Sequence, residues 1–337
     1  MNVLVTGGAG YIGSHAVKHL REQGHHVVVL DNLHRGHRAA LDAIEQASGK
    51  HVPFEELDLR HTEAVTSALV HHKIDCVMHF AALAYVGESV TEPLTYYDNN
   101  TAGTLSLLQA MHDAGVRRLV FSSTCATYGE PASMPIVETM PQSPINPYGW
   151  SKLFVERILI DYANANKDFA FAALRYFNVA GSAADGTIGE DHEPETHLIP
   201  IILEVALGQR EHVTIFGEDY DTPDGTCIRD YIHVEDLVAA HSMVMQKLNP
   251  ADQRFYNLGI GQGYSVKQIV DAAREVTGRD IPAQMGPRRP GDPPSLYANA
   301  DKLRTEVGWT PSYTDIHRVI ETAWRWYRNH PDGYAQP

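Results

Sequence analysis

Residues 2–13 read NVLVTGGAGYIG, a short apolar run that leads directly into a cluster of glycines. The apolar part is typical of a strand buried in a parallel sheet. In the spacing G-x-x-G-x-x-G, Gly7 would allow a tight turn and Gly10 the close approach of the backbone to a pyrophosphate. Gly13 would let the next helix, predicted near residues 12–23, pack closely on the strand with its positive end facing the phosphates. The stretch therefore predicts a dinucleotide-binding unit.

A second apolar run, residues 27–30, ends at Asp31, which lies 18 residues after Gly13. A carboxylate there can accept hydrogen bonds from both ribose hydroxyls of adenosine and would repel a 2′-phosphate. Arg35 and Arg38 follow closely and could favour a phosphate, but we interpret both as residues of a solvated loop. NAD is therefore predicted as the cofactor in preference to NADP.

Apolar runs and helical patterns alternate through the first half of the chain. This alternation implies right-handed crossovers and a parallel sheet with helices on both faces, which is the doubly wound α/β (Rossmann) fold. After about Asn178 the pattern loosens into stretches rich in glycine and proline, where we expect a smaller mixed α/β domain to cover the cleft. We predict strands at residues 3–6, 27–31, 52–57, 75–80, 117–122 and 169–175, and helices near 12–23, 62–72, 93–114 and 148–166.

The composition fits a cytoplasmic enzyme. The length of 337 residues suggests about two domains. Three cysteines, Cys76, Cys125 and Cys227, cannot form a closed set of disulfides, which favours a reducing compartment. Neither a standard secretion signal nor a run of about 18 apolar residues is present, so no membrane span is expected. The formal net charge of −15 disfavours nucleic acid and anionic membranes as partners.

The stretch NPYGWSK, residues 146–152, carries a candidate for proton transfer. Pro147 favours a helix start at its own position, so Tyr148 and Lys152 would stand one turn apart on the same helical face. Free tyrosine has a pKa of about 10, so a phenolate at neutral pH needs positive charge nearby. The Lys152 ammonium would lower the pKa of Tyr148 by about 1–3, and the positive ring of an oxidised nicotinamide would supply the remainder. The pair therefore predicts alcohol oxidation and reduction beside the cofactor.

Residues 122–129 read SSTCATYG and follow the apolar run 119–121. Doubly wound sheets bind their ligands at the carboxyl ends of strands. We therefore expect these hydroxyls, Thr124 among them, to face the site.

The nineteen histidines raise the question of a metal. His192 and His197 enclose two glutamates in the stretch HEPETH, which superficially resembles a zinc-protease helix. The two histidines are five positions apart, however, and Pro194 disrupts the helix that such a site needs. We therefore predict no metal site.

Ordered motifs along nearly the whole chain resemble those of the UDP-sugar 4-epimerases, of the UDP-glucose 4-epimerase type, in the extended short-chain dehydrogenase/reductase family. The resemblance implies NAD-dependent, reversible inversion at C4 of a UDP-hexose (UDP-glucose/UDP-galactose) through a 4-keto sugar. Beside the stretches above, the matching motifs are HFAA 79–82, VGES 86–89, YDNN 97–100, LRYFN 174–178, GTCIRDYIHV 225–234, PRRPGD 287–292 and WRW 324–326.

The resemblance also implies an organisation of the chain. Residues 1–177 plus about 229–260 would form the NAD-binding domain, and about 178–228 plus 261–337 the UDP-sugar-binding domain. A homodimer would form through the helices near 93–114 and 148–166.

By the same resemblance, the Tyr148 phenolate removes the proton of the sugar 4-hydroxyl while the C4 hydride passes to NAD. Lys152 would hold the nicotinamide ribose, and Thr124 would hydrogen-bond the 4-oxygen. The keto sugar then turns about its pyrophosphate linkage and takes the hydride back on its other face. The implied cofactor contacts are Gly7, Gly10, Tyr11, Ile12, Gly13, Asp31, Asn32, Asp58, Leu59, Phe80, Ala81, Ala82, Asn99, Tyr148, Lys152 and Phe177, and the implied substrate contacts are Thr124, Tyr148, Asn178, His197, Leu198, Phe216, Arg229, Arg289, Asp292 and Leu296.

The chain departs from the commonest epimerase pattern at several positions. Thr124 replaces the usual Ser, and Ala84 stands where many relatives have Lys. Trp150 lies inside the Tyr–Lys turn and is expected to face outward or toward a partner. His197 replaces a common Asn beside the substrate. Leu296 occupies a position where a large Tyr excludes N-acetyl sugars and a small residue admits them, so UDP-N-acetylglucosamine stays open as a substrate.

Other interpretations share part of the pattern. The stretch 122–129 also resembles UDP-xylose/UDP-arabinose 4-epimerases. Sugar-nucleotide 4,6-dehydratases place Asp-Glu directly after the threonine, and UDP-glucuronate decarboxylases expect a Glu in this segment, whereas this chain has Cys125 and Ala126. A non-catalytic NAD-sensing module would need the glycine turn but not Tyr148, Lys152 and Thr124 together.

Overall fold

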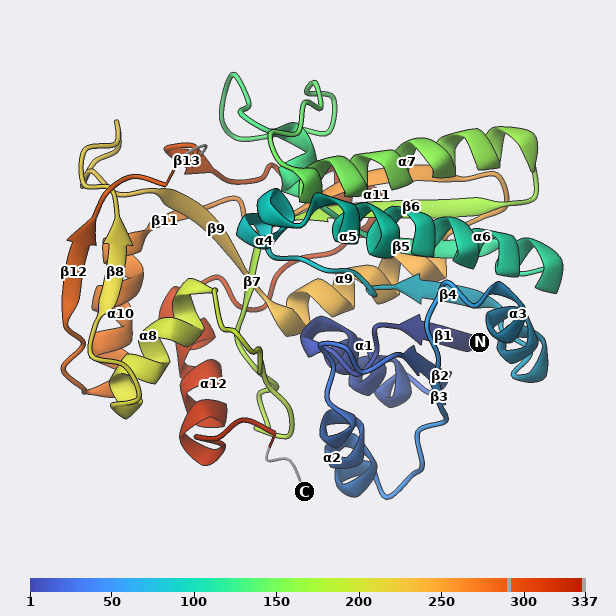
Figure 1. The fold of residues 1–337 in the computed structure, drawn as a ribbon, viewed down its shortest axis with the longest axis horizontal. Coiled ribbons are helices and arrows are strands. Elements are labelled where there is room, and N and C mark those ends of the chain that lie inside the picture. Colours follow the sequence, from blue (N-terminus) through green and yellow to red (C-terminus); the bar gives the residue numbers. More distant parts are fainter. Residues whose placement is uncertain (290–291, 335–337) are drawn as a thin grey trace.

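The computed structural model describes residues 1–289 and 292–334, so Pro290 and Gly291 of the motif PRRPGD lie outside the described residues. Its central feature is a seven-stranded sheet whose neighbouring strands are all parallel. The strand order, β3-β2-β1-β4-β5-β6-β10, reverses beside β1, which is where doubly wound sheets place a nucleotide. The strands are β1 (Asn2–Thr6), β2 (His26–Asp31), β3 (Phe54–Glu56), β4 (Cys76–His79), β5 (Arg118–Thr124), β6 (Ala170–Tyr176) and β10 (Gln253–Leu258) (Figure 1).

Helices cover both faces of this sheet, and each face has its own apolar core. One core joins the sheet to α1 (Tyr11–Glu22), α2 (Arg38–Ser48), α9 (Val234–Lys247) and α11 (Asp301–Val307). The other core joins it to α3 (Thr62–His71), α6 (Gly103–Ala114) and α7 (Pro147–Ala165). Burial on both faces explains why β1 and β2 are continuous apolar runs. The predicted doubly wound α/β fold is confirmed.

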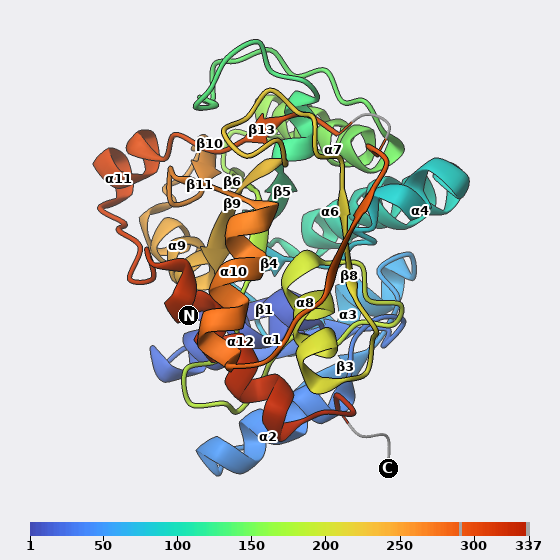
Figure 2. The same ribbon diagram turned by 90° about the vertical axis from the view of Figure 1, so that its left-hand side faces the viewer.

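Shorter strands and three further helices pack beside the carboxyl ends of the large sheet, and Figure 2 shows the three helices in front of it. Strands β7 (Asn178–Ala180), β11 (Gly263–Ser265) and β13 (Ser295–Leu296) all pair with β9 (Ile228–His233). Strands β8 (Val213–Phe216) and β12 (Ala283–Gly286) form a separate parallel pair. Helices α8 (Leu198–Leu207), α10 (Val266–Thr277) and α12 (Ile316–Asn329) share one core, which includes Trp324 and Trp326.

The six predicted strands are confirmed to within two residues at each end, and the structure adds β10 as a seventh. The prediction of a loop at Arg38 is wrong, because Arg38 begins α2 and its Nε donates to Asp42 Oδ1 at 2.9 Å, one turn later. Helix α2 buries Leu41 and Ile44 against the sheet, which is the tertiary contact that stabilises it.

The helix predicted over 93–114 is three consecutive elements. After α4 (Val86–Thr91), α5 (Pro93–Tyr96) is followed by a π-helix, η1 (Tyr97–Ala102), and then by α6. The amide of Asn100, within η1, accepts from Leu83 N at 2.8 Å and donates to Leu83 O at 2.9 Å. The wider π turn therefore ties this helix to the loop after β4, and such turns are frequent at functional sites.

Candidate active site

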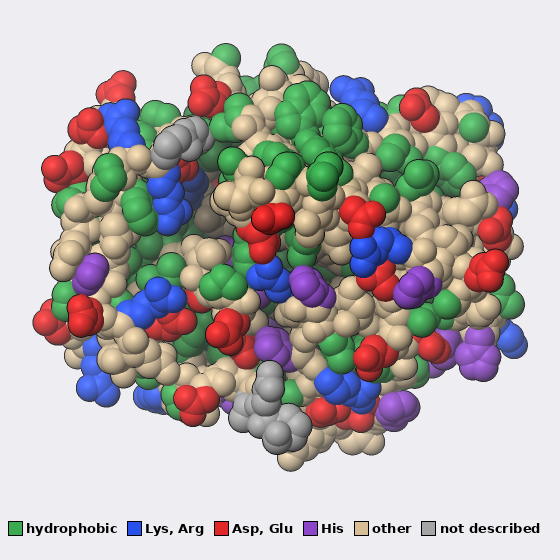
Figure 3. Space-filling view, in the orientation of Figure 1, with side chains coloured by type: hydrophobic (Ala, Val, Ile, Leu, Met, Phe, Trp, Pro, Cys, Tyr) green, Lys and Arg blue, Asp and Glu red, His purple; other side chains and the backbone are tan. Residues whose placement is uncertain are grey.

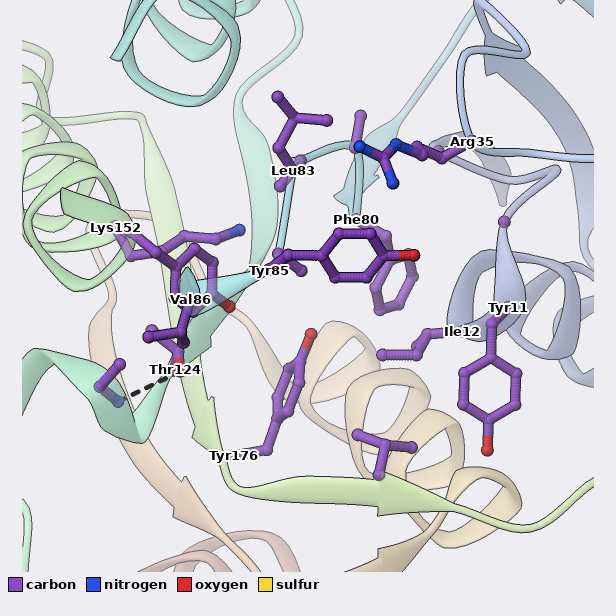
Figure 4. A pocket seen from close by; sticks show the side chains of 18 of the residues that line it. Tyr11, Ile12, Arg35, Phe80, Leu83, Tyr85, Val86, Thr124, Lys152 and Tyr176 are labelled. Carbon is purple, nitrogen blue, oxygen red and sulfur yellow. Dashed lines mark hydrogen bonds between the residues drawn. The ribbon is translucent and has the colours of Figure 1, made fainter. Parts of the chain in front are cut away.

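One cavity of about 460 Å³ opens at the carboxyl ends of the central strands. All sixteen residues predicted to contact the cofactor line it, from Gly7 after β1 to Phe177 after β6. Figure 4 shows Lys152 and Thr124 at one end of the cavity and Tyr11, Ile12 and Arg35 at the other. The strand order had located a nucleotide site at this edge, and the side chains that line the cavity agree with it.

The glycine turn has the shape that a pyrophosphate requires. Gly7 has φ of +70°, a conformation that favours glycine. A Cβ on Gly13 would stand 2.0 Å from the carbonyl oxygen of Gly7, so only glycine lets α1 start this close to the turn. A Cβ on Gly10 would meet only that same oxygen, at 3.4 Å, and Gly10 lines the cavity. The backbone is thus open to a ligand at the positive end of α1.

The acid at the end of β2 lies in the same wall. The carboxylate of Asp31 accepts from Ala9 N at 3.0 Å and from Leu33 N at 2.9 Å. These bonds fix its orientation, while burial raises its pKa above the usual value. Two further predicted residues are joined beside it, because Asn32 Nδ2 donates to Asp58 Oδ2 at 2.9 Å.

Arg35 lies in the loop between β2 and α2, as predicted, but its side chain is not simply solvated. Arg35 lines the cavity, its guanidinium lies over the ring of Tyr85 at 4.6 Å, and its Nη2 lies 2.6 Å from Glu88 Oε1. Its charge is therefore paired within the protein. This pairing removes the argument that Arg35 marks a 2′-phosphate site.

Helix α7 presents the predicted catalytic pair to the cavity. Its start is fixed by Asn146, whose side-chain oxygen accepts from Gly149 N at 2.8 Å, and by Pro147 in the first turn. Tyr148 and Lys152 are 8% and 4% exposed and both line the cavity. Thr124, at the end of β5, lines it as well and accepts from Ala126 N at 3.1 Å.

Within the protein itself, burial dominates the pKa of both members of the pair. It raises the pKa of Tyr148 far above the usual value, and a hydrogen bond to Thr124 opposes that shift only in part. It lowers the pKa of Lys152 to about 7, and the Lys152 ammonium donates to Ser122 O at 2.9 Å. The predicted lowering of the Tyr148 pKa by Lys152 is therefore not supplied by the protein alone. A further positive charge is needed at this end of the cavity.

The predicted substrate residues divide into two groups. Beside Thr124 and Tyr148, the residues Asn178, His197, Arg229, Asp292 and Leu296 line the cavity, and Arg229 forms an ion pair with Asp292. Leu198, Phe216 and Arg289 are not among the described residues that line it. The guanidinium of Arg289 lies 4.0 Å from the ring centre of Phe216, so these two residues contact each other although neither lines the cavity.

Three aromatic and acidic residues of the cavity wall escaped the sequence analysis. Tyr176 lines the cavity between the two ends seen in Figure 4, and its hydroxyl bonds to Ser122 Oγ. Tyr85 and Glu190 also line it. Tyr176 could have been predicted, because it ends β6 directly before the predicted Phe177, at the edge of the sheet where ligands bind. Tyr85 and Glu190 lie in irregular segments, where nothing in the local sequence indicates a place in the cavity wall.

His192 and His197 come together with Glu190 and Glu195 at the rim of the same cavity. Burial alone would lower the pKa of each imidazole, but the neighbouring carboxylates raise it, to about 9 for His192 and about 10 for His197. The same contacts hold the pKa of Glu195 down, at about 2, against the effect of its burial.

Comparison with known proteins agrees with this geometry. Residues 3–259 match the NAD dependent epimerase/dehydratase family. The chain belongs to this family. It is 51% identical, over 99% of both chains, to the UDP-glucose 4-epimerase of Lacticaseibacillus casei. It is 46% identical to the probable UDP-arabinose 4-epimerase 3 of Oryza sativa subsp. japonica, over 99% of this chain and 84% of the rice protein.

Among solved structures, the UDP-glucose 4-epimerase of Bifidobacterium longum in complex with NAD+ and UDP superposes with a TM-score of 0.95. The two sequences are 41% identical, and the match covers 99% of this chain and 100% of that one. The family and this match confirm the predicted resemblance and NAD as the cofactor. Among the described residues, no helix has the length and apolar character needed to cross a membrane.

Proposed function

We propose that the chain is a UDP-glucose 4-epimerase, an isomerase that reversibly inverts C4 of UDP-glucose and UDP-galactose through a 4-keto sugar. The observation that carries this proposal is the convergence of Tyr148, Lys152 and Thr124 in one cavity with the glycine turn and Asp31. Relatives and solved structures named as UDP-glucose 4-epimerases support it.

The protein's own part in the reaction is to move a proton and to orient the sugar. Bound NAD supplies the acceptor and donor of the C4 hydride. The Tyr148 phenolate takes the proton of the 4-hydroxyl and, as the phenol, returns it, and Thr124 hydrogen-bonds the 4-oxygen. Lys152 positions the nicotinamide ribose. Since burial raises the pKa of Tyr148, the phenolate depends on positive charge from the oxidised ring, and base strength follows the redox state of the cofactor.

The remaining proposed contacts hold the nucleotide part of the substrate. Arg229 is already oriented by Asp292 in the cavity wall, and a guanidinium suits a diphosphate because it donates in a planar fork. Arg289 and Phe216 stack on each other but do not line the cavity, so they would contact the UDP only if ligand binding moves them toward the cavity. Asn178 and Leu198, with His197 and Leu296 nearer the sugar, complete the set that the resemblance implies.

A UDP-xylose/UDP-arabinose 4-epimerase is the second candidate. The stretch SSTCATYG and the 46% identity to a probable UDP-arabinose 4-epimerase favour it. UDP-N-acetylglucosamine is a further candidate substrate, because the half-buried Leu296 lines the cavity and is intermediate in size between the large Tyr that excludes N-acetyl sugars and the small residue that admits them. Dehydration is disfavoured because Cys125 and Ala126, which line the cavity after Thr124, provide no carboxylate there.

An apolar surface supports a homodimer. Large apolar side chains on α4, α5, α6 and α7 are exposed, and Figure 3 shows hydrophobic side chains gathered over this part of the molecule. Contiguous apolar patches of this kind mark interaction surfaces. The exposed residues are Val86, Val90, Leu94, Leu105, Trp150 and Phe154, and Leu94 is 81% exposed. Sedimentation at micromolar concentration should give a dimer, and a monomer alone would contradict this proposal.

We extend the proposal to the organisation of the chain. Residues 1–177 plus about 229–260 would act as the NAD-binding unit, and about 178–228 plus 261–337 as the UDP-sugar-binding unit, in a cytoplasmic enzyme. The sheet memberships support the division, because β10 lies in the parallel sheet whereas β7, β11 and β13 pair with β9. The strand β9 itself falls within the residues assigned to the NAD-binding unit, so the boundary crosses this small sheet.

The direct test is a substrate comparison. The purified chain is incubated separately with UDP-glucose, UDP-xylose and UDP-N-acetylglucosamine without added NAD, and the 4-epimers are resolved chromatographically. We expect conversion with cofactor retained from purification, fastest for UDP-glucose. Faster conversion of UDP-xylose would favour the second candidate. No conversion of any of the three, even with NAD supplied to folded protein, would reject the epimerase proposal in favour of an NAD-sensing module.

A further inference from the structure

Four side chains gather at the rim of the cavity, in the segment that joins β7 to α8. They are Glu190, His192, Glu195 and His197, and one donor atom from each lies within 4.8 Å of the others. Glu190 and Glu195 are 3% and 8% exposed. Two imidazoles and two carboxylates form a donor set that suits a divalent transition metal such as Zn²⁺.

Three distances between the donor atoms are close to those between ligand atoms of a tetrahedral zinc site. Nδ1 of His192 lies 3.2 Å from Oε1 of Glu190 and 3.7 Å from Oε2 of Glu195. Nδ1 of His197 lies 3.0 Å from the same Glu190 oxygen. Zinc bonds of about 2.0–2.2 Å place the ligand atoms of a tetrahedral site about 3.3–3.6 Å apart. These three distances bracket that range and the whole set lies within 4.8 Å, so side-chain shifts would complete the site.

Hydrogen bonding leaves two of these atoms without a partner. Nδ1 of His192 and Oε2 of Glu195 are both buried and form no hydrogen bond. The Glu195 side chain is only 3% exposed. Its other oxygen, Oε1, accepts from the backbone N–H groups of Thr196 and His197, each at 2.7 Å, and these bonds fix the carboxylate. Buried polar atoms without partners are rare in folded proteins, and a shared cation would satisfy both atoms.

The rival explanation is a cluster of ion pairs between imidazolium and carboxylate groups. It accounts for His197, whose Nδ1 lies 2.9 Å from Oε1 of Glu195. For His192 it gives ion-pair contacts of Nδ1 with Glu190 Oε1 at 3.2 Å and Glu195 Oε2 at 3.7 Å, but it leaves both His192 Nδ1 and Glu195 Oε2 without a hydrogen bond. The sequence argument against a metal assumed a helix, and here Pro194 lies in an irregular segment that brings Glu190 into the group.

From this arrangement we propose that Glu190, His192, Glu195 and His197 bind one divalent transition-metal ion, best matched by Zn²⁺. Four protein ligands close a tetrahedral site, so the ion is structural and takes no part in the reaction. It would fix the segment between β7 and α8 at the rim of the cavity. The proposal shares His197 with the predicted substrate set, but its test measures the bound ion itself and does not depend on epimerase activity.

The test measures metal binding directly. Tag-free protein is dialysed against a chelator, and Zn²⁺ is then titrated by calorimetry, with metal content measured after gel filtration. We expect one Zn²⁺ per chain and a higher unfolding temperature with the ion. Co²⁺ in its place should give the intense visible absorption of tetrahedral cobalt. Less than stoichiometric Zn²⁺ together with no tetrahedral cobalt spectrum would overturn the proposal.

Variants locate the ion. Glu195→Gln and His192→Gln should each weaken Zn²⁺ binding by at least about 100-fold, since even outer-shell changes cost about 10–100-fold. The matched control is His317→Gln, because His317 is an exposed imidazole held between Asp315 and Glu275 at 2.9 and 3.0 Å. Unchanged affinity in Glu195→Gln would place the ion elsewhere and refute the site. If neither cluster variant folds, the cobalt spectrum of the wild-type chain decides the question.

Discussion

Glu156 provides a quantitative test of how the active-site helix is held. It follows Tyr148 and Lys152 at intervals of four residues, so the three side chains share one face of α7. The Glu156 side chain is 1% exposed and forms a two-point ion pair with Arg175 of β6, at 2.9 and 2.7 Å. Ser123 Oγ donates to the same carboxylate at 2.6 Å, and Gln142 Nε2 donates to it at 2.9 Å. The pair therefore fixes α7 against the strands that end at the cavity.

The variant Glu156→Gln keeps the shape of the side chain and removes its charge. Whichever way the amide is placed, one of the two Arg175 donors faces an amide N–H group and loses its acceptor. A hydrogen bond to a charged group contributes about 1.5–3 kcal/mol, and breaking a buried ion pair by removing one partner costs about 3–5 kcal/mol. We expect a loss of about 3–5 kcal/mol in unfolding free energy by this reasoning.

Equilibrium urea unfolding, followed by tryptophan fluorescence, measures this loss. The control is Asp168→Asn, which breaks the ion pair of Arg117 and Asp168 at 2.9 Å, where the two side chains are 33% and 66% exposed. That change should cost at most about 1 kcal/mol. A double variant, Glu156→Leu with Arg175→Met, should be more stable than Glu156→Gln, because no buried charge is left unpaired. If Glu156→Gln loses no more than the control, the argument is refuted.

Three further predictions follow from the cavity. Thr124→Ser should keep kcat for UDP-glucose within a few-fold, whereas Thr124→Ala should lower it by about 10²–10³, the usual cost of removing a donor to a reacting oxygen; equal rates would contradict the assigned role. Gly13→Ala should lose bound NAD and thermal stability, since its Cβ would stand 2.0 Å from a carbonyl oxygen, while Gly87→Ala, with nothing within 4 Å, should retain both in gel filtration and thermal unfolding. Burial lowers the pKa of Lys152 from 10.5 to about 7, so between these values the unfolded chain binds more protons and stability rises with pH. Urea unfolding of NAD-free protein at several pH values should show a smaller rise of the unfolding free energy in Lys152→Met than in the wild-type protein. An identical rise in both proteins would show that the ionisation of Lys152 does not cause it.

Local sequence was sufficient where the structure depends on short-range rules. Residues 2–13 specify strand, turn and helix because near contacts at Gly7, Gly8 and Gly13 leave no room for a Cβ, as the 2.0 Å separation at Gly13 shows. Pro147 and the i, i+4 spacing placed Tyr148 and Lys152 on one face, and both line the cavity. Because Thr124 stands at the carboxyl end of a parallel strand, its position in the sequence was enough to predict that it lies near Tyr148 and Lys152.

The sequence was insufficient where contacts between segments far apart in the chain determine the surroundings of a residue. Arg35 could not be assigned to the cavity wall, because its partner Glu88 lies far along the chain in α4 and nothing in the neighbours of Arg35 indicates that contact. The histidine pair in HEPETH was judged on helical spacing, whereas its geometry depends on an irregular segment and on Glu190. The pKa of Tyr148 was expected to fall beside Lys152, but burial, a tertiary property, acts in the opposite direction.

The most direct test of the central claim follows the hydrogen at C4. UDP-glucose carrying deuterium at C4 is converted in ordinary water by the purified chain, and the product is examined by mass spectrometry and NMR. Our account predicts UDP-galactose that retains the deuterium at C4, because the same hydride leaves and returns while Tyr148 exchanges only the hydroxyl proton. Product formed with loss of deuterium to solvent would contradict it, since that result requires removal of the C4 hydrogen as a proton.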